Sequence, residues 1–188
     1  MINVTGIAVA VAEFDPAGNA RAADSRERTL ALLHGHPHPL DRTSYDPGHV
    51  TASGIVLAPS GTALLLVFHP RLGRWLQPGG HLDPRDDTVA GAARREVIEE
   101  TGVTPDPAVS PLLVSIDVHE IPPVRSEPPH LHHDLVYRFV APLDVPRPLA
   151  EVSRVVWCAI DDLEAAGTDE PLRRAVARAL RVPPHQNR

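Results

Sequence analysis

The chain has 188 residues, of which 43% are hydrophobic and 22% charged, and its formal net charge is −6. That balance is typical of a globular domain with its own core. The acidic excess argues against non-specific nucleic-acid binding, which depends on lysine and arginine. All 18 basic residues are arginines, so Schiff-base chemistry and a phosphate-loop lysine are excluded.

No apolar run approaches the roughly 20 residues that a helix needs to span a bilayer. Residues 6–12 have the character of a signal-peptide core, but no basic residue precedes them. We therefore expect a strand or helix of the fold there. Cys158 is the only cysteine and cannot form an internal disulfide. A cytoplasmic protein without membrane association is the expectation that follows.

Residues 1–47 are expected to form an N-terminal extension that packs on the same domain. A capping box at Asp24 and Glu27 predicts a short helix over about 25–34. Three histidines then fall within residues 34–38. Prolines between them favour an extended chain, and no cysteine or acid lies at ligand spacing, so a zinc site is disfavoured there.

From residue 49 onward, the hydrophobic pattern changes to that of strands. We expect strands at 49–58, 62–69, 112–121, 130–140 and 152–157, and helices at 89–101, from 160 and at 170–181. This mixed order predicts an α/β/α sandwich around a mixed β-sheet. The domain is expected to span 48–182, with a short tail at 183–188.

The predicted helix 89–101 carries a group of carboxylates. Glu96, Glu99 and Glu100 fall within an arc of roughly 100° on a helix. Glu96 and Glu100 are like charges at i and i+4, a spacing that destabilises a helix unless a cation lies nearby. Ligands that are all oxygen indicate a hard divalent ion, Mg²⁺ or Mn²⁺. The alternative is a solvated acidic face supported by an Arg95–Glu99 pair.

The run from Arg95 to Val103, Arg-Glu-Val-Ile-Glu-Glu-Thr-Gly-Val, follows Gly80 and closely resembles the Nudix box of the Nudix hydrolases. The second half of the box, REUxEExGU with U apolar, matches at every fixed position. The first half departs from the pattern, because Asp86 meets the spacing counted from the glycine and Asp87 the spacing counted from the arginine. The loop is therefore one residue longer and carries a shorter acid.

The resemblance implies the same α/β/α fold and the Mg²⁺-dependent cleavage of a phosphoanhydride bond, with Mn²⁺ as the alternative ion. The substrate class that it implies is a nucleoside diphosphate linked to another moiety. By the same resemblance, Glu96 and Glu100 would be metal ligands together with the carbonyl of Gly79. Glu99 would be a further ligand or the base that deprotonates water, and Arg95 would orient the carboxylates.

Two residues flanking the Gly-Gly loop are candidates for substrate binding. Trp75 could stack on a base or a sugar, with packing in the core as the other interpretation. His81 lies at the mouth of the loop and could contact a phosphate.

The strand predicted at 130–140 supplies two more candidates. Period-two alternation groups His132 and Asp134 with His130 and places His133 on the opposite face. A carboxylate near His132 is expected to raise the pKa of its imidazole, which would favour binding of a phosphate oxygen and a pH dependence between about 5 and 8. The alternative is an edge strand with a solvated polar face.

The expected partner is a small-molecule, nucleotide-type diphosphate, without nucleic acid or membrane, and a homodimer is one option for the quaternary structure. A non-catalytic sensor of a nucleotide or ADP-ribose is the main rival. A diphosphate isomerase is a weaker one, because it calls for a reactive cysteine and Cys158 lies in the last strand. The loops 35–48 and 122–130 are expected to select the substrate, and neither contains a known specificity motif.

Overall fold

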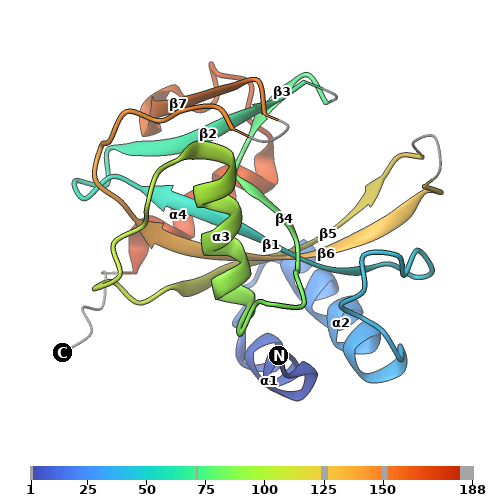
Figure 1. Ribbon diagram of the computed structural model, residues 1–188. Coiled ribbons are helices and arrows are strands. Elements are labelled where there is room, and N and C mark those ends of the chain that lie inside the picture. The colour runs from blue at the N-terminus through green and yellow to red at the C-terminus, as the bar shows by residue number, and fades with distance from the viewer. Residues whose placement is uncertain (1, 71, 124–126, 150–151, 183–188) are drawn as a thin grey trace. The chain divides into compact units, whose positions relative to one another are not determined.

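The computed structural model describes residues 2–70, 72–123, 127–149 and 152–182. The predicted tail 183–188 and residues 124–126 of the predicted loop 122–130 lie outside these ranges. The elements shown in Figure 1 are α1 (Val4–Glu13), α2 (Ala20–Gly35), β1 (His49–Leu57), β2 (Ala63–His69), β3 (Arg74–Leu76), β4 (Gly79–His81), α3 (Val89–Thr101), β5 (Leu112–Ile121), β6 (His130–Val140), β7 (Arg154–Ala159), η1 (Ile160–Asp162) and α4 (Glu170–Arg181).

The N-terminal region differs from the sequence prediction. Residues 6–12 lie in helix α1, which is one of the two forms expected for them, but α2 begins at Ala20 instead of near residue 25. The side chain of Asn19 accepts a hydrogen bond from the backbone N–H of Ala22 at 2.9 Å, so Asn19 is the N-cap. The predicted capping box at Asp24 is wrong, because that residue lies inside the helix.

The strands form one sheet in the order β3-β2-β1-β6-β5, with β4 paired to β1 and β7 paired to β2. Strand β2 runs antiparallel to β1, β3 and β7. Strand β6 lies between β1 and β5, so residues 130–134 are not part of an edge strand. The alternative of a solvated edge for this polar segment is therefore wrong. Within the described ranges, no helix has both the length and the apolar character needed to cross a bilayer.

The chain forms two compact units, and the first contains residues 1–52, 80–92 and 115–135. In this unit α1 and α2 lie side by side, in blue in Figure 1. The backbone N–H of Val118 on β5 donates to the hydroxyl of Ser25 on α2 at 3.1 Å. Thr29 on α2 contacts His133 on β6, with 3.1 Å between Oγ1 and Nδ1. Helix α2 is thus attached to β5 and β6 through buried polar groups.

Removal of the Thr29 hydroxyl should destabilise the first unit. This hydroxyl donates to the carbonyl of Ser25 at 2.8 Å, so it accepts from the Nδ1–H of His133. In Thr29→Val the buried Nδ1–H would lose its partner, at a cost of about 1–3 kcal/mol. Urea unfolding should show this loss, whereas the exposed Thr104→Val should change little. An unchanged midpoint in Thr29→Val would show that the contact does not hold α2.

The second unit contains residues 53–79, 93–114 and 136–188. Ile55 and Leu57 on β1 pack in one apolar cluster with four residues of α4: Leu172, Ala175, Val176 and Ala179. Gly54 directly precedes Ile55 on β1, so its Cβ direction points to the other face of the strand. A Cβ added at Gly54 would lie 2.6 Å from Cγ2 of Val97 on α3. Because alternate residues of a strand face opposite sides, α3 and α4 cover opposite faces of this part of β1. This is the predicted α/β/α sandwich.

Candidate functional site

Helix α3 ends where the sequence predicts, and its end is anchored by hydrogen bonds. Gly102 has φ +67°, a left-handed conformation that suits glycine, and its N–H donates to the carbonyl of Ile98 at 2.9 Å. The guanidinium of Arg94 donates to the carbonyls of Pro105 and Asp106 at 2.7 and 3.2 Å. These contacts fix the C-terminal half of α3, which carries the predicted glutamates.

The three glutamates of α3 lie around one arginine and one backbone amide. Arg95 Nη1 donates to Glu96 Oε1 at 2.7 Å and to Glu99 Oε2 at 3.0 Å. The predicted Arg95–Glu99 pair is therefore present. The N–H of Gly79 donates to Glu100 Oε2 at 3.0 Å, which brings the Gly-Gly loop to the helix. The side chains of Glu96 and Glu99 are 15% and 52% exposed, so the group extends from a half-buried edge to solvent.

The longer loop before α3 uses Asp86, one of the two aspartates that meet the spacing of the box, for its own closure. The carboxylate of Asp86 accepts from the backbone N–H of Asp83 at 2.8 Å, and the N–H of Asp86 donates to the carbonyl of Asp83 at 2.9 Å. Asp86 is only 9% exposed, whereas Asp87 is exposed. The contacts of Asp86 thus support a structural role in the loop.

In the first unit, two of the predicted residues lie in a cluster of histidines. The ring centroids of His81 and His132 are 5.2 Å apart, and His49 lies 5.1 Å from the first and 4.9 Å from the second. His130 and His119 adjoin the ring of His132 at 5.1 and 5.7 Å. Each of β1, β4, β5 and β6 contributes at least one ring.

The electrostatics of this cluster differ from the sequence expectation. Burial lowers the pKa of His132 to about 2, with further lowering by neighbouring histidines. Burial also lowers the pKa of His81 to about 4. The expectation that a carboxylate raises the pKa of His132 is wrong, because desolvation and like charges dominate at this position. The imidazole of His132 is neutral throughout the range between pH 5 and 8, so it gives no pH dependence there.

The side chains of Asp134 and Trp75, two predicted substrate-binding residues, both contact other residues of the protein. Asp134 is 3% exposed, and its carboxylate accepts from the hydroxyl of Thr51 at 3.1 Å. Trp75 packs edge-on against Phe68 at 5.3 Å, with the guanidinium of Arg154 5.1 Å from its ring. Both contacts of Trp75 favour packing, and its predicted stacking on a substrate stays a prediction.

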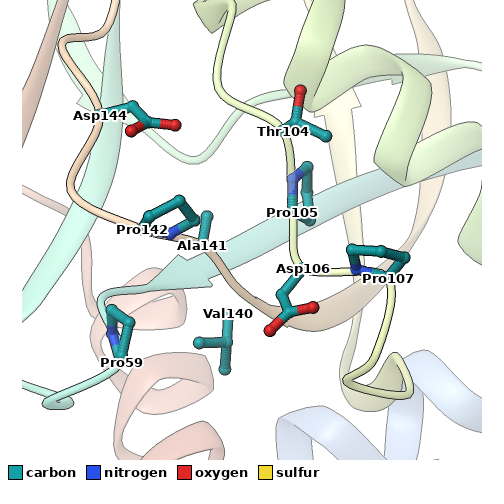
Figure 2. A pocket seen from close by; sticks show the side chains of 9 residues that line it. All are labelled: Pro59, Thr104, Pro105, Asp106, Pro107, Val140, Ala141, Pro142 and Asp144. Carbon is teal, nitrogen blue, oxygen red and sulfur yellow. The ribbon is translucent and has the colours of Figure 1, made fainter.

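The second unit contains a hollow of about 420 Å³. Figure 2 shows its wall of prolines with the carboxylates of Asp106 and Asp144. Its described lining residues include neither an arginine nor a histidine, and none of the three glutamates of α3. Such a lining is unsuited to an anionic diphosphate.

Sequence reasoning did not identify His49 as part of a site. Its ring is fully buried at the start of β1, a position that the sequence pattern assigns only to strand packing. His49 and His132 are 83 residues apart in the numbering and meet only through sheet pairing, which no local pattern reveals.

Comparisons with known proteins agree with the fold. Residues 47–180 match the family model of the NUDIX domain. The NUDIX domain of Shewanella oneidensis NrtR, solved in complex with ADP ribose, superposes with a TM-score of 0.55 at 19% identity, covering 93% of this chain and 96% of that one. The Escherichia coli dihydroneopterin triphosphate pyrophosphohydrolase gives a TM-score of 0.54 at 18% identity, covering 71% of this chain and 96% of that one.

The binary complex of a Caenorhabditis elegans Ap4A hydrolase gives a TM-score of 0.50 at 18% identity, with 69% of this chain and 93% of that one covered. At such identities, these likenesses establish the fold. No curated protein sequence matches the chain.

Proposed function

The chain belongs to the NUDIX-domain family, and we propose that it is a hydrolase that cleaves a phosphoanhydride bond in a nucleoside diphosphate linked to another moiety. The observation that carries this proposal is the arrangement of Glu96, Glu99 and Glu100 around Arg95 and the Gly79 amide. Hydrolysis of such a bond needs charge neutralisation and an activated water, and carboxylates on a rigid helix can provide for both.

The donor set fits a hard divalent cation. Three carboxylates and one guanidinium leave two formal negative charges on this part of α3, and oxygen is the donor that Mg²⁺ and Mn²⁺ prefer. Glu96, Glu100 and the backbone of Gly79 would hold Mg²⁺, which leaves Glu99 for proton transfer. The bound ion would neutralise charge on the bridging phosphates.

Glu99 is the carboxylate that we assign to proton transfer. Its side chain is 52% exposed, so water reaches it, whereas Glu96 is 15% exposed. The guanidinium of Arg95 contacts both carboxylates and sets the direction of their oxygens. We therefore treat Arg95 as a positioning residue.

Substitution of Arg95 tests whether its guanidinium orients the carboxylates of Glu96 and Glu99. Arg95→Gln should lower kcat about 10- to 100-fold, as expected for a group that orients ligands, and should raise the Mg²⁺ concentration needed for half-maximal rate. Arg95→Lys should restore part of the loss, because both contacts come from the single nitrogen Nη1 and an ammonium also carries more than one N–H donor. Equal Mg²⁺ requirements in the wild type and Arg95→Gln would contradict the positioning role.

The substrate is tested by a screen of the purified chain with Mg²⁺. Nucleotide sugars, dinucleoside polyphosphates, ADP-ribose and oxidised nucleotides would be incubated separately, and the products separated by ion-exchange chromatography. At least one compound should give a Mg²⁺-dependent product in which a phosphoanhydride is cleaved. Absence of turnover on every compound, with ADP-ribose bound in calorimetry, would instead favour the second candidate, a non-catalytic sensor.

The sensor is kept as a second candidate because the NrtR NUDIX domain, complexed with ADP ribose, aligns over 93% of this chain. The isomerase alternative has little support. Burial raises the pKa of the Cys158 thiol, and a nearby carboxylate at Asp162 raises it further, so the nucleophilic thiolate is disfavoured.

A further inference from the structure

We propose that His49, His81 and His132 form a binding site for a Zn²⁺-type transition-metal ion, held by imidazole nitrogens. One ring nitrogen from each residue lies within 4.8 Å of the others. Zn–N bonds of about 2.0–2.1 Å in a tetrahedral site place neighbouring nitrogens about 3.4 Å apart. Small side-chain rotations would therefore bring the three nitrogens to the separations that a bound ion requires.

The ligands come from three different strands of the first unit. His49 begins β1, His81 ends β4 and His132 lies in β6. Because β1 pairs with both β4 and β6, the backbone holds the three positions next to one another before any ion binds. Preorganisation of this kind favours a built site over a chance meeting of flexible side chains.

The rings are in the protonation state that binds a metal. Burial lowers the pKa of all three histidines, to about 4 for His81 and about 2 for His132. This burial favours neutral imidazole, which is the form that donates a lone pair to a metal.

The hydrogen bonds of His49 leave one nitrogen for an ion. Its Nδ1 lies 3.1 Å from the carbonyl of Ser44, which can only accept, so Nδ1 carries the proton. Its Nε2 then has a lone pair. Among the residues that the structure describes, this buried Nε2 has no hydrogen-bond partner. Metal-bound histidines commonly donate their other N–H to a backbone carbonyl, as His49 does.

A series of hydrogen bonds through His130 determines which ring nitrogen of His132 carries the proton. Nδ1 of His130 lies 2.8 Å from the carbonyl of Pro128 and must donate to it. Nε2 of His130 is then an acceptor, and it lies 3.3 Å from Nε2 of His132. His132 therefore carries its proton on Nε2, and its Nδ1 is free of a proton. In this arrangement His130 is a positioning residue for the ligand His132.

Packing alone explains the cluster less well. Buried polar atoms in proteins nearly always have a partner, and a group of neutral imidazoles gains little from mutual contact when one buried nitrogen stays without one. Imidazole suits Zn²⁺, Co²⁺ and Ni²⁺, whereas Mg²⁺ prefers oxygen. This site thus differs in metal class from the carboxylates of α3.

The test measures metal binding by the metal-stripped full chain. Calorimetric titration with Zn²⁺ in the presence of excess Mg²⁺ should show one tight site in the wild type. His132→Ala should weaken that site at least about 100-fold, and His130→Ala about 10- to 100-fold. His34→Ala, an exposed histidine on α2, should leave it unchanged. Glu100→Gln should also leave it unchanged, because it alters only the carboxylate set.

Co²⁺ provides a readout that does not depend on turnover or on the proposed hydrolase activity. Bound to the wild type, it should give the intense visible absorption of tetrahedral coordination, and His81→Asn should remove that absorption while circular dichroism shows a folded chain. His81→Asn thus replaces His132→Ala as the test if the latter does not fold. Zn²⁺ binding that is absent, displaced by Mg²⁺, or lost in Glu100→Gln but kept in the histidine variants would overturn the proposal.

Discussion

Glu100→Gln should lower kcat by about 100-fold or more, equivalent to about 2.7 kcal/mol of transition-state stabilisation, while the fold stays intact. The substitution removes the charge of a proposed Mg²⁺ ligand without changing its volume. The amide oxygen of glutamine can still accept from the N–H of Gly79, which donates to Glu100 Oε2 at 3.0 Å. Steady-state kinetics with saturating Mg²⁺ on the substrate found in the screen measures the effect.

A control and a stability measurement separate a catalytic role of Glu100 from a structural one. Glu27→Gln, at an exposed position on α2, makes the same chemical change and should leave kcat unchanged. Without metal, Glu100→Gln should melt at the same temperature as the wild type or slightly above it, because it relieves the i,i+4 repulsion with Glu96. More than about a tenth of the wild-type kcat would show that Glu100 is not a central ligand.

Gly54→Ala should destabilise the second unit and lower activity together. The added Cβ would lie 2.6 Å from Cγ2 of Val97 and 3.3 Å from Cδ2 of Phe139. Val97 is fully buried on α3, so we expect the helix to shift away from β1. Overpacking of this kind costs about 1–3 kcal/mol, or roughly 2–12 °C in Tm for a chain of this size.

The activity loss follows because α3 positions the carboxylates. A shift at Val97 moves Glu96 beside it and Glu100 one turn later, away from the backbone of Gly79. Gly35→Ala is the matched control, since a Cβ there meets no atom within 4 Å and the backbone is helical. The Tm measured by calorimetry and the kcat should both fall in Gly54→Ala and stay unchanged in Gly35→Ala. A normal Tm in that variant would mean that the core adapts without moving the helix.

Local patterns in the sequence were sufficient for the elements that carry the carboxylates. Helix α3 and strands β5 and β6 begin and end at the predicted residues, because a long amphipathic helix and long alternating strands give strong periodic signals. Gly102 marks the helix end through its left-handed conformation. The Arg95–Glu99 contact follows from helical spacing alone.

Features that depend on distant segments were not predictable. The start of α2 was missed because Asn19, the N-cap, stands in a stretch without a clear hydrophobic period. The pKa of His132 was expected to rise, yet it falls to about 2, because the rings around it come from other strands and water is excluded. His49 joins that cluster only through the pairing of β1 in the sheet.

The most direct test of the hydrolase account is the position of an oxygen label after turnover. The substrate found in the screen would be cleaved in H₂¹⁸O with Mg²⁺, and the products would be weighed by mass spectrometry. Attack of water on one phosphorus of the phosphoanhydride predicts two products that both carry phosphate, with one ¹⁸O atom in the phosphate of the product whose phosphorus is attacked and none in the other. Release of an alcohol or sugar without a phosphate, or cleavage that proceeds equally in Glu100→Gln, would contradict the account.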